Sequence, residues 1–152
     1  MSDIRSEITI LIADDDADDR FLIHDALRDC NVQNQVLFVE DGEELTDYLN
    51  RIGKYSDPNN SPRPGLILLD LNMPRKDGIE ALKEIKSNPH LRSIPIVILS
   101  TSRADEDISR AYDLGANSFI SKPVSYDGLV EAMTSLKLFW LQVVQVPRDS
   151  DA

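Results

Sequence analysis

The chain has little of what several classes of protein need. Among its 152 residues there is one cysteine, Cys30, which excludes an intramolecular disulfide and is typical of a reducing compartment. No apolar run is long enough to span a bilayer, and the N-terminal segment is not typical of a signal peptide. The 16 basic residues are outnumbered by 27 acidic ones, and the formal net charge is -11. Because phosphate binding needs a basic surface, this balance argues against a nucleic-acid partner. We expect a soluble, cytoplasmic protein that binds neither membrane nor nucleic acid.

What the chain does have is a regular alternation of short apolar runs and amphipathic helical patterns. The runs cover 8–13, 36–39, 66–69, 96–99 and 118–121, and the helical patterns cover 17–30, 43–52, 77–87, 104–114 and 126 into the 140s. Three of the runs are continuously apolar, which is typical of strands buried on both faces of a parallel sheet. At this length the alternation predicts one α/β domain with a doubly wound parallel sheet.

Carboxylates, hydroxyls and one ammonium group follow the apolar runs. They are Asp14 and Asp15 after the first run, Asp70 after the third, Ser100 and Thr101 after the fourth, and Lys122 after the fifth. We expect these groups to converge, because the carboxyl ends of parallel strands form the ligand crevice of an open α/β sheet. Two carboxylates at ~4 Å repel by about 4 kcal/mol at an effective dielectric near 20. A proton or a divalent cation must offset that repulsion, and an oxygen-only donor set favours Mg²⁺ or Mn²⁺ over Zn²⁺.

The aspartates between positions 14 and 19 allow a second interpretation. Aspartates after a strand often cap the next helix, whose dipole favours negative charge. For Asp14 and Asp15 the metal and capping interpretations are about equally supported, whereas for Asp16, Asp18 and Asp19 capping and lining the first turn is the better one. Asp70 is harder to explain in this way, because a carboxylate that ends a buried strand is costly without a partner.

Four segments together resemble the receiver domain of two-component response regulators, over about residues 8–138. They are LIADDD (11–16), LILLDLNMPRKDG (66–78), PIVILSTS (95–102) and LGANSFISKPV (114–124). The resemblance implies an α/β, flavodoxin-like, doubly wound sheet of five parallel strands in the order 2-1-3-4-5 with five helices. It also implies a signalling protein rather than an enzyme. Such a protein accepts a phosphoryl group on Asp70 from a histidine kinase and assists its own phosphorylation and dephosphorylation.

The same resemblance implies a role for each site residue. Mg²⁺ (or Mn²⁺) would be bound by Asp15, Asp70 and the backbone carbonyl of Asn72, with Asp14 acting mainly through water. Lys122, Ser100 and Thr101 would contact the phosphoryl group, Phe119 would be the switch aromatic, and the Lys122–Pro123 peptide bond would be cis. The sequence departs from the common family pattern at Phe119, where Tyr is frequent, and at Ser100, where Thr is common. Phe119 therefore offers no hydroxyl for a hydrogen bond.

The C-terminal part of the chain raises the question of a dimer. Residues 1–146 are predicted to form the single domain and 147–152 a tail, and no output domain fits after Lys122. The segment LKLFWLQVVQV (136–146) is apolar almost all round, so it either folds back over its own core or forms a self-complementary dimer interface. We favour the dimer, because an exposed apolar patch is a liability on a monomer. Its predicted contacts are Phe139, Trp140, Leu141, Val143 and Val144. This ending and the proline-bearing loop at 53–65 resemble the stand-alone response regulators that partner bacterial phytochrome kinases.

Two other functions compete with this interpretation. A pseudo-receiver that only dimerises would be favoured if Asp70, Lys122 or one of the acidic pair were missing, and none is. A Mg²⁺-dependent phosphatase of the haloacid dehalogenase type expects a second aspartate two residues after the nucleophile, where this chain has Asn72. The leading hypothesis is a homodimeric receiver whose partners are a histidine kinase and, in a longer relay, a histidine phosphotransfer protein.

Overall fold

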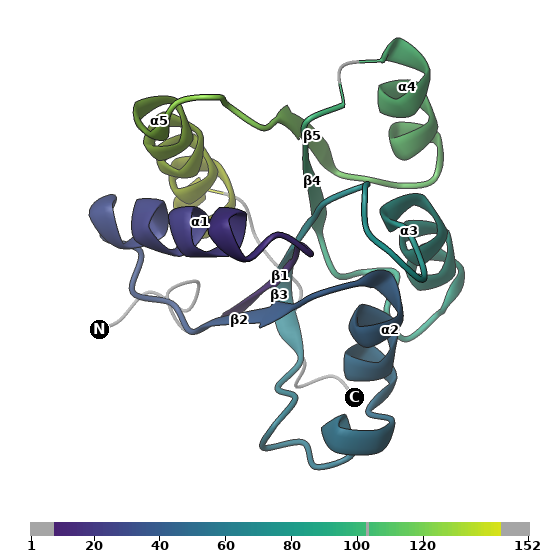
Figure 1. Cartoon of the computed structure of the whole chain (residues 1–152). Coiled ribbons are helices and arrows are strands. Elements are labelled where there is room, and N and C mark those ends of the chain that lie inside the picture. The colour runs from purple at the N-terminus through teal and green to yellow at the C-terminus, as the bar shows by residue number, and fades with distance from the viewer. Residues whose placement is uncertain (1–7, 103, 144–152) are drawn as a thin grey trace.

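The computed structural model describes residues 8–102 and 104–143, which form a five-stranded sheet with helices on both faces (Figure 1). The strands are β1 (Thr9–Ala13), β2 (Val36–Val39), β3 (Pro64–Leu69), β4 (Ile96–Ser100) and β5 (Ser118–Ser121). The helices are α1 (Ala17–Asp29), α2 (Gly42–Asn50), α3 (Gly78–Ser87), α4 (Asp105–Asp113) and α5 (Tyr126–Leu136). A 3-10 turn (Gly53–Tyr55) follows α2, and a π-helical segment (Lys137–Val143) continues α5. All neighbouring strands pair in parallel in the order β2-β1-β3-β4-β5, which confirms the predicted fold.

The sheet separates two apolar cores. Helices α1 and α5 cover one face, and α2, α3 and α4 cover the other (Figure 1). Successive residues of β3 contribute to opposite cores: Leu66 and Leu68 pack toward α1 and α5, whereas Ile67 and Leu69 pack toward α2 and α3. All four side chains are at most 1% exposed. The continuous apolar run in the sequence follows from this double coverage.

The strand order places the functional edge of the sheet. The chain leaves β1 toward β2 on one side and returns to β3 on the other, so the order of winding reverses between β1 and β3. Ligands of open α/β sheets bind beyond the carboxyl ends of the strands at such a point. Asp14 and Asp15 directly follow β1, and Asp70 directly follows β3. The residues predicted to bind a metal therefore stand at the reversal.

The C-terminal segment differs from the favoured prediction. Trp140 and Leu141 are only 8% and 4% exposed and belong to the core under α1 and α5. Trp140 lies four residues after Leu136, so it continues the stripe of buried residues that α5 presents to the sheet. Placing these two side chains in a dimer interface was therefore wrong, and the fold-back alternative holds for them. Phe139 remains 53% exposed; the side chain of Val143 and the whole of Val144 lie outside the described residues.

Within residues 8–102 and 104–143, no helix is long and apolar enough to cross a membrane.

Candidate functional site

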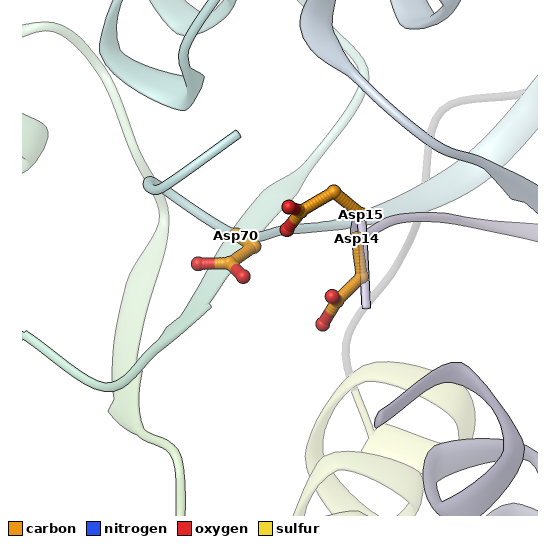
Figure 2. Close-up of side chains that lie close together, drawn as sticks. All are labelled: Asp14, Asp15 and Asp70. Carbon is orange, nitrogen blue, oxygen red and sulfur yellow. The ribbon is translucent and has the colours of Figure 1, made fainter. Parts of the chain in front are cut away.

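Three carboxylates meet at the carboxyl ends of β1 and β3 (Figure 2). One carboxylate oxygen from each of Asp14, Asp15 and Asp70 can be chosen so that all lie within 4.8 Å of one another. The main chain of two of them extends the sheet ladder: the Asp14 amide donates to the Val39 carbonyl at 3.1 Å, and the Asp70 amide donates to the Ala13 carbonyl at 3.0 Å. The convergence predicted from the sequence is therefore present, and backbone hydrogen bonds fix its position.

Each buried carboxylate divides its two oxygens between the local backbone and Lys122. Asp14, 2% exposed, accepts the amide of Asp16 on Oδ1 at 2.9 Å and the ammonium of Lys122 on Oδ2 at 2.8 Å. Asp70, 7% exposed, accepts the amide of Asn72 on Oδ1 at 3.1 Å and Lys122 on Oδ2 at 3.3 Å. Asp15 is exposed. These bonds let two buried carboxylates share one edge of the sheet, because a buried charge is tolerated only when it is paired and hydrogen-bonded.

Lys122 is brought into the site from the end of β5. Its backbone amide donates to the Ser100 carbonyl at 2.7 Å, which anchors the residue beside β4. Its ammonium nitrogen also lies 2.9 Å from Oδ2 of Asp19, in the first turn of α1. Asp19 was assigned only to the helix terminus, so this contact was not predicted from the sequence. The capping prediction itself is confirmed for Asp16, whose side chain accepts the amides of Asp18 and Asp19.

Burial and pairing act in opposite directions on these groups. Burial raises the pKa of Asp14 above its ordinary value of 3.8, while hydrogen bonds from Lys122 and the Asp16 amide partly offset that rise. Burial alone would lower the pKa of Lys122, but hydrogen bonds to Asp14 and Asp19 outweigh it, and the pKa is raised. Lys122 is therefore a permanent cation at neutral pH, and burial makes Asp14 hold a proton more readily than an ordinary aspartate does.

The donor set suits a hard divalent cation. Asp14, Asp15 and Asp70 offer oxygen atoms alone, and no histidine or cysteine joins the cluster within the described part of the chain. Asp15 leaves one side of the cluster open to water, which Mg²⁺ and Mn²⁺ retain in part when they bind to proteins. The residues present therefore fit such an ion. The role of the Asn72 carbonyl stays a prediction.

The residues predicted to sense a phosphoryl group lie on β4 and β5. Ser100 is fully buried and its hydroxyl accepts the Ser102 amide at 3.3 Å, whereas Thr101 is exposed. Phe119 is half-buried and packs against the core under α3 and α4. Its backbone amide donates to the hydroxyl of Tyr112, in α4, at 3.0 Å. This hydrogen bond between β5 and α4 was not predicted, because residue spacing alone does not show that α4 packs beside β5.

The predicted cis peptide bond between Lys122 and Pro123 is wrong. The described residues contain no cis peptide bond, so the Lys122–Pro123 bond is trans. Trans is the lower-energy isomer by about 0.5–1 kcal/mol before proline. With it the Lys122 ammonium already reaches three carboxylates, so the observed contacts do not call for the cis isomer.

The loop between β3 and α3 is fastened to α2. The guanidinium of Arg75 lies 2.8 Å from Oδ2 of Asp41, and the amide of Gly42 donates to the Lys76 carbonyl at 2.9 Å. A Cβ on Gly78 would lie 2.3 Å from the backbone oxygen of Asp70. Gly78 is thus required for close approach to the chain that carries Asp70. Gly78 has no positive φ, so close approach and not a left-handed backbone explains glycine at this position.

An acidic cluster at β1 and β3, a lysine after β5 and a buried hydroxyl at the end of β4 define the class of signalling domain that the sequence resembles, the receiver domain. The family model of the response regulator receiver domain matches residues 10–134, and the chain belongs to that family. The resemblance stated from the sequence is therefore confirmed.

Individual relatives cover nearly the whole chain. The response regulator Rcp1 of Synechocystis sp. is 38% identical over 141 residues, which span 93% of this chain and 93% of Rcp1. A crystal structure of the phosphorylated cyanobacterial phytochrome response regulator RcpA matches with a TM-score of 0.87 and 42% identity, over 93% of this chain and 99% of RcpA. The Mn(2+)-bound form of Rcp1 matches with a TM-score of 0.84 and 37% identity, over 93% and 99% of the two chains. This chain is thus similar to response regulators associated with phytochromes.

Proposed function

We propose that this receiver accepts a phosphoryl group on Asp70 from the phosphohistidine of a histidine kinase, with Mg²⁺ or Mn²⁺ bound beside it. The observation that carries the proposal is the convergence of Asp14, Asp15 and Asp70 on one edge of the sheet with Lys122 against two of them. A pseudo-receiver would have no use for this arrangement, which is costly to bury. The haloacid dehalogenase alternative is less well supported, because that family expects an aspartate where this chain has Asn72, and because the chain belongs to the receiver family.

In this reaction a carboxylate oxygen of Asp70 attacks phosphorus, the new O–P bond forms as the N–P bond breaks, and the imidazole of the kinase leaves. Phosphoryl transfer depends mainly on positioning and on neutralising charge on the phosphoryl oxygens. The divalent ion, held by Asp15 and Asp70 with Asp14 acting through water, would supply the larger part of that positive charge. Lys122, which already donates to Asp70, supplies the rest.

The conformational output follows from the new charge on Asp70. A phosphoryl oxygen attracts the hydroxyl of Ser100, which is buried and, within the described part of the chain, forms one long hydrogen bond, accepted from the Ser102 amide. Thr101 adds a second hydroxyl at the mouth of the site. As Ser100 moves toward the phosphoryl group, Phe119 turns further into the core beneath α4. Such a local electrostatic event, coupled to a side chain with two packed positions, is a common form of switch.

The partners we propose are a histidine kinase of the phytochrome type and a second copy of this chain. RcpA, 42% identical, is described as a cyanobacterial phytochrome response regulator, which supports the first. A histidine phosphotransfer protein suits the same chemistry in reverse, since the acyl phosphate on Asp70 can return to a histidine. We place this signalling in the cytoplasm, as the lone cysteine favours. Residues 1–146 form the receiver in this proposal, and 147–152 are a tail.

The dimer part of the proposal rests on the exposed side of the C-terminal segment. Leu138 and Phe139 are each 53% exposed, next to the buried Trp140. We expect Phe139→Glu to lower the apparent mass in sedimentation, with Val124→Glu as control because Val124 is 99% exposed on a different loop. An unchanged mass in Phe139→Glu would remove Phe139 from any interface.

The phosphoacceptor role has a direct test. The protein is incubated with acetyl phosphate and Mg²⁺, and its intact mass is recorded. We expect the gain of one phosphoryl group, absent in Asp70→Asn and after chelation. No gain with any donor would favour the pseudo-receiver, and hydrolysis of many phosphomonoesters would favour the phosphatase.

A further inference from the structure

Lys122 has three anionic acceptors, and one of them is outside the predicted metal cluster. Its ammonium lies 2.8 Å from Asp14, 2.9 Å from Asp19 and 3.3 Å from Asp70. An ammonium has three N–H donors, so these contacts engage all of them. Asp14 and Asp70 also belong to the three-carboxylate cluster, whereas Asp19 does not.

A divalent ion at the cluster would change the balance of forces on Lys122. It would attract the carboxylates of Asp14 and Asp70 and repel the ammonium, since like charges a few ångströms apart repel strongly in a partly buried site. Two of the three attractions on Lys122 would then be weakened at the step where the ammonium is needed. The attraction to Asp19 would persist, because that carboxylate is not among the metal ligands.

The backbone of Asp19 is fixed in a position from which its carboxylate can serve as this remaining partner. It lies in the first turn of α1, and its backbone amide donates to the capping carboxylate of Asp16 at 3.1 Å. Asp19 and Lys122 also line a small hollow of about 120 Å³, together with Leu22 and Tyr126, and no carboxylate of the metal cluster lines it. Without the carboxylate of Asp19, an ammonium repelled by the metal would have this hollow and water beside it.

We propose that Asp19 is a positioning residue that holds the Lys122 ammonium in the site while the metal occupies the other carboxylates. The inference rests on the proposed function and deepens it. The N–H group of Lys122 that now donates weakly to Asp70 is the one that donates to a phosphoryl oxygen after phosphorylation. Asp19 keeps the Lys122 nitrogen close enough for this change of acceptor. Asp19 itself touches neither the metal nor the phosphoryl group.

The first test observes the ammonium group directly. The protein is labelled with ¹⁵N-lysine, and the Lys122 signal is identified by its loss in Lys122→Arg. The exchange of the ammonium hydrogens with water is then measured by NMR, in chelator and in saturating Mg²⁺. With Mg²⁺ we expect about fivefold faster exchange in Asp19→Asn than in the parent, corresponding to about 1 kcal/mol. In chelator Asp14 and Asp70 still hold the ammonium, so we expect little change.

Asp18→Asn is the matched control. Asp18 is the exposed neighbour in the same turn of α1, so its replacement removes the same charge at nearly the same place. This variant should behave as the parent in both solutions. Parent-like exchange in Asp19→Asn with Mg²⁺ would overturn the proposal. So would an equal increase with and without Mg²⁺, which would indicate a plain salt bridge without a role in metal binding.

The second test compares phosphorylation at saturating acetyl phosphate and Mg²⁺. Losing one negative charge speeds the approach of an anionic donor in both variants, so the comparison is between Asp19→Asn and Asp18→Asn. We expect the former to be about fivefold slower at its maximal rate. Equal rates would overturn the inference alone. If the parent gains no phosphoryl group, the proposed function fails instead, so the two failures are distinguishable.

Discussion

Replacing Lys122 by methionine removes the one cation that, within the described residues, forms ion pairs with Asp14, Asp19 and Asp70. Its side chain is 9% exposed, and two of its partners, Asp14 and Asp70, are 2% and 7% exposed. Breaking a buried pair by removing one partner costs about 3–5 kcal/mol. Because Asp19 is 34% exposed and can regain water, we expect the lower end, about 3 kcal/mol in chelator at neutral pH. For a chain of this length that lowers the melting temperature by about 10 °C.

The same variant should respond to Mg²⁺ and to pH in defined directions. A metal ion restores positive charge to the cluster and no longer competes with the ammonium, so Mg²⁺ should stabilise Lys122→Met more than the parent. Protonation of the carboxylates also removes the repulsion, so the loss of stability should shrink as the pH falls. Burial already raises the pKa of Asp14, so this carboxylate takes up a proton at a higher pH than an ordinary aspartate does.

Urea denaturation followed by the fluorescence of Trp140 measures these effects, since it is the only tryptophan and is 8% exposed. Lys54→Met is the control, because the Lys54 side chain is 71% exposed and pairs with Glu44 alone among carboxylates within the described residues. Its midpoint should match that of the parent. A loss below about 1 kcal/mol in Lys122→Met, or equal Mg²⁺ stabilisation of both proteins, would show that Lys122 does not offset repulsion among these carboxylates.

Three further predictions follow from other parts of the structure. Trp140→Ala should cost about 3–5 kcal/mol in urea denaturation, whereas Phe139→Ala, half-exposed beside it, should cost about 1 kcal/mol or less; equal costs would contradict the packing of the C-terminal segment. Burial raises the pKa of Asp14 above its ordinary value of 3.8, so a proton competes with Mg²⁺ at a higher pH than it would at an ordinary aspartate. As the pH is lowered, the affinity for Mg²⁺ in titration calorimetry should therefore begin to fall while the pH is still above 3.8. A decrease that begins only near pH 3.8 would contradict this prediction. Gly78→Ala places a methyl group 2.3 Å from the backbone oxygen of Asp70, so it should lower the free energy of unfolding by about 2 kcal/mol and slow phosphorylation. Parent-like stability and a parent-like phosphorylation rate would show that the loop can move to accept the methyl group.

The fold and the central cluster could be predicted because they depend on patterns local to the sequence. A run such as 66–69 is apolar without alternation because Leu66 and Ile67 face two different cores. The polar residue that follows each run marks the end of a strand, and parallel strands end at one edge of the sheet. For that reason the sequence alone predicts that Asp14, Asp15, Asp70 and Lys122 lie together.

The rest depends on how elements are placed against one another. Asp19 could be assigned to the first turn of a helix, but its partner Lys122 lies 103 residues away. Only the folded arrangement, in which α1 packs beside α5, brings the two side chains together (Figure 1). The C-terminal segment was misread because LKLFWLQVVQV is apolar in almost every position. Only the continuation of the α5 stripe through Leu136 separates the buried Trp140 from the exposed Phe139.

The most direct test of Asp70 as the phosphoacceptor locates the phosphoryl group on the chain. The protein is phosphorylated with acetyl phosphate and Mg²⁺ and reduced with borohydride, which converts an aspartyl phosphate into homoserine, and its peptides are sequenced by mass spectrometry. We expect homoserine at position 70 and at no other aspartate, with none formed after chelation or in Asp70→Asn. Homoserine at another acidic position, or a phosphoryl group that persists in Asp70→Asn, would contradict this expectation.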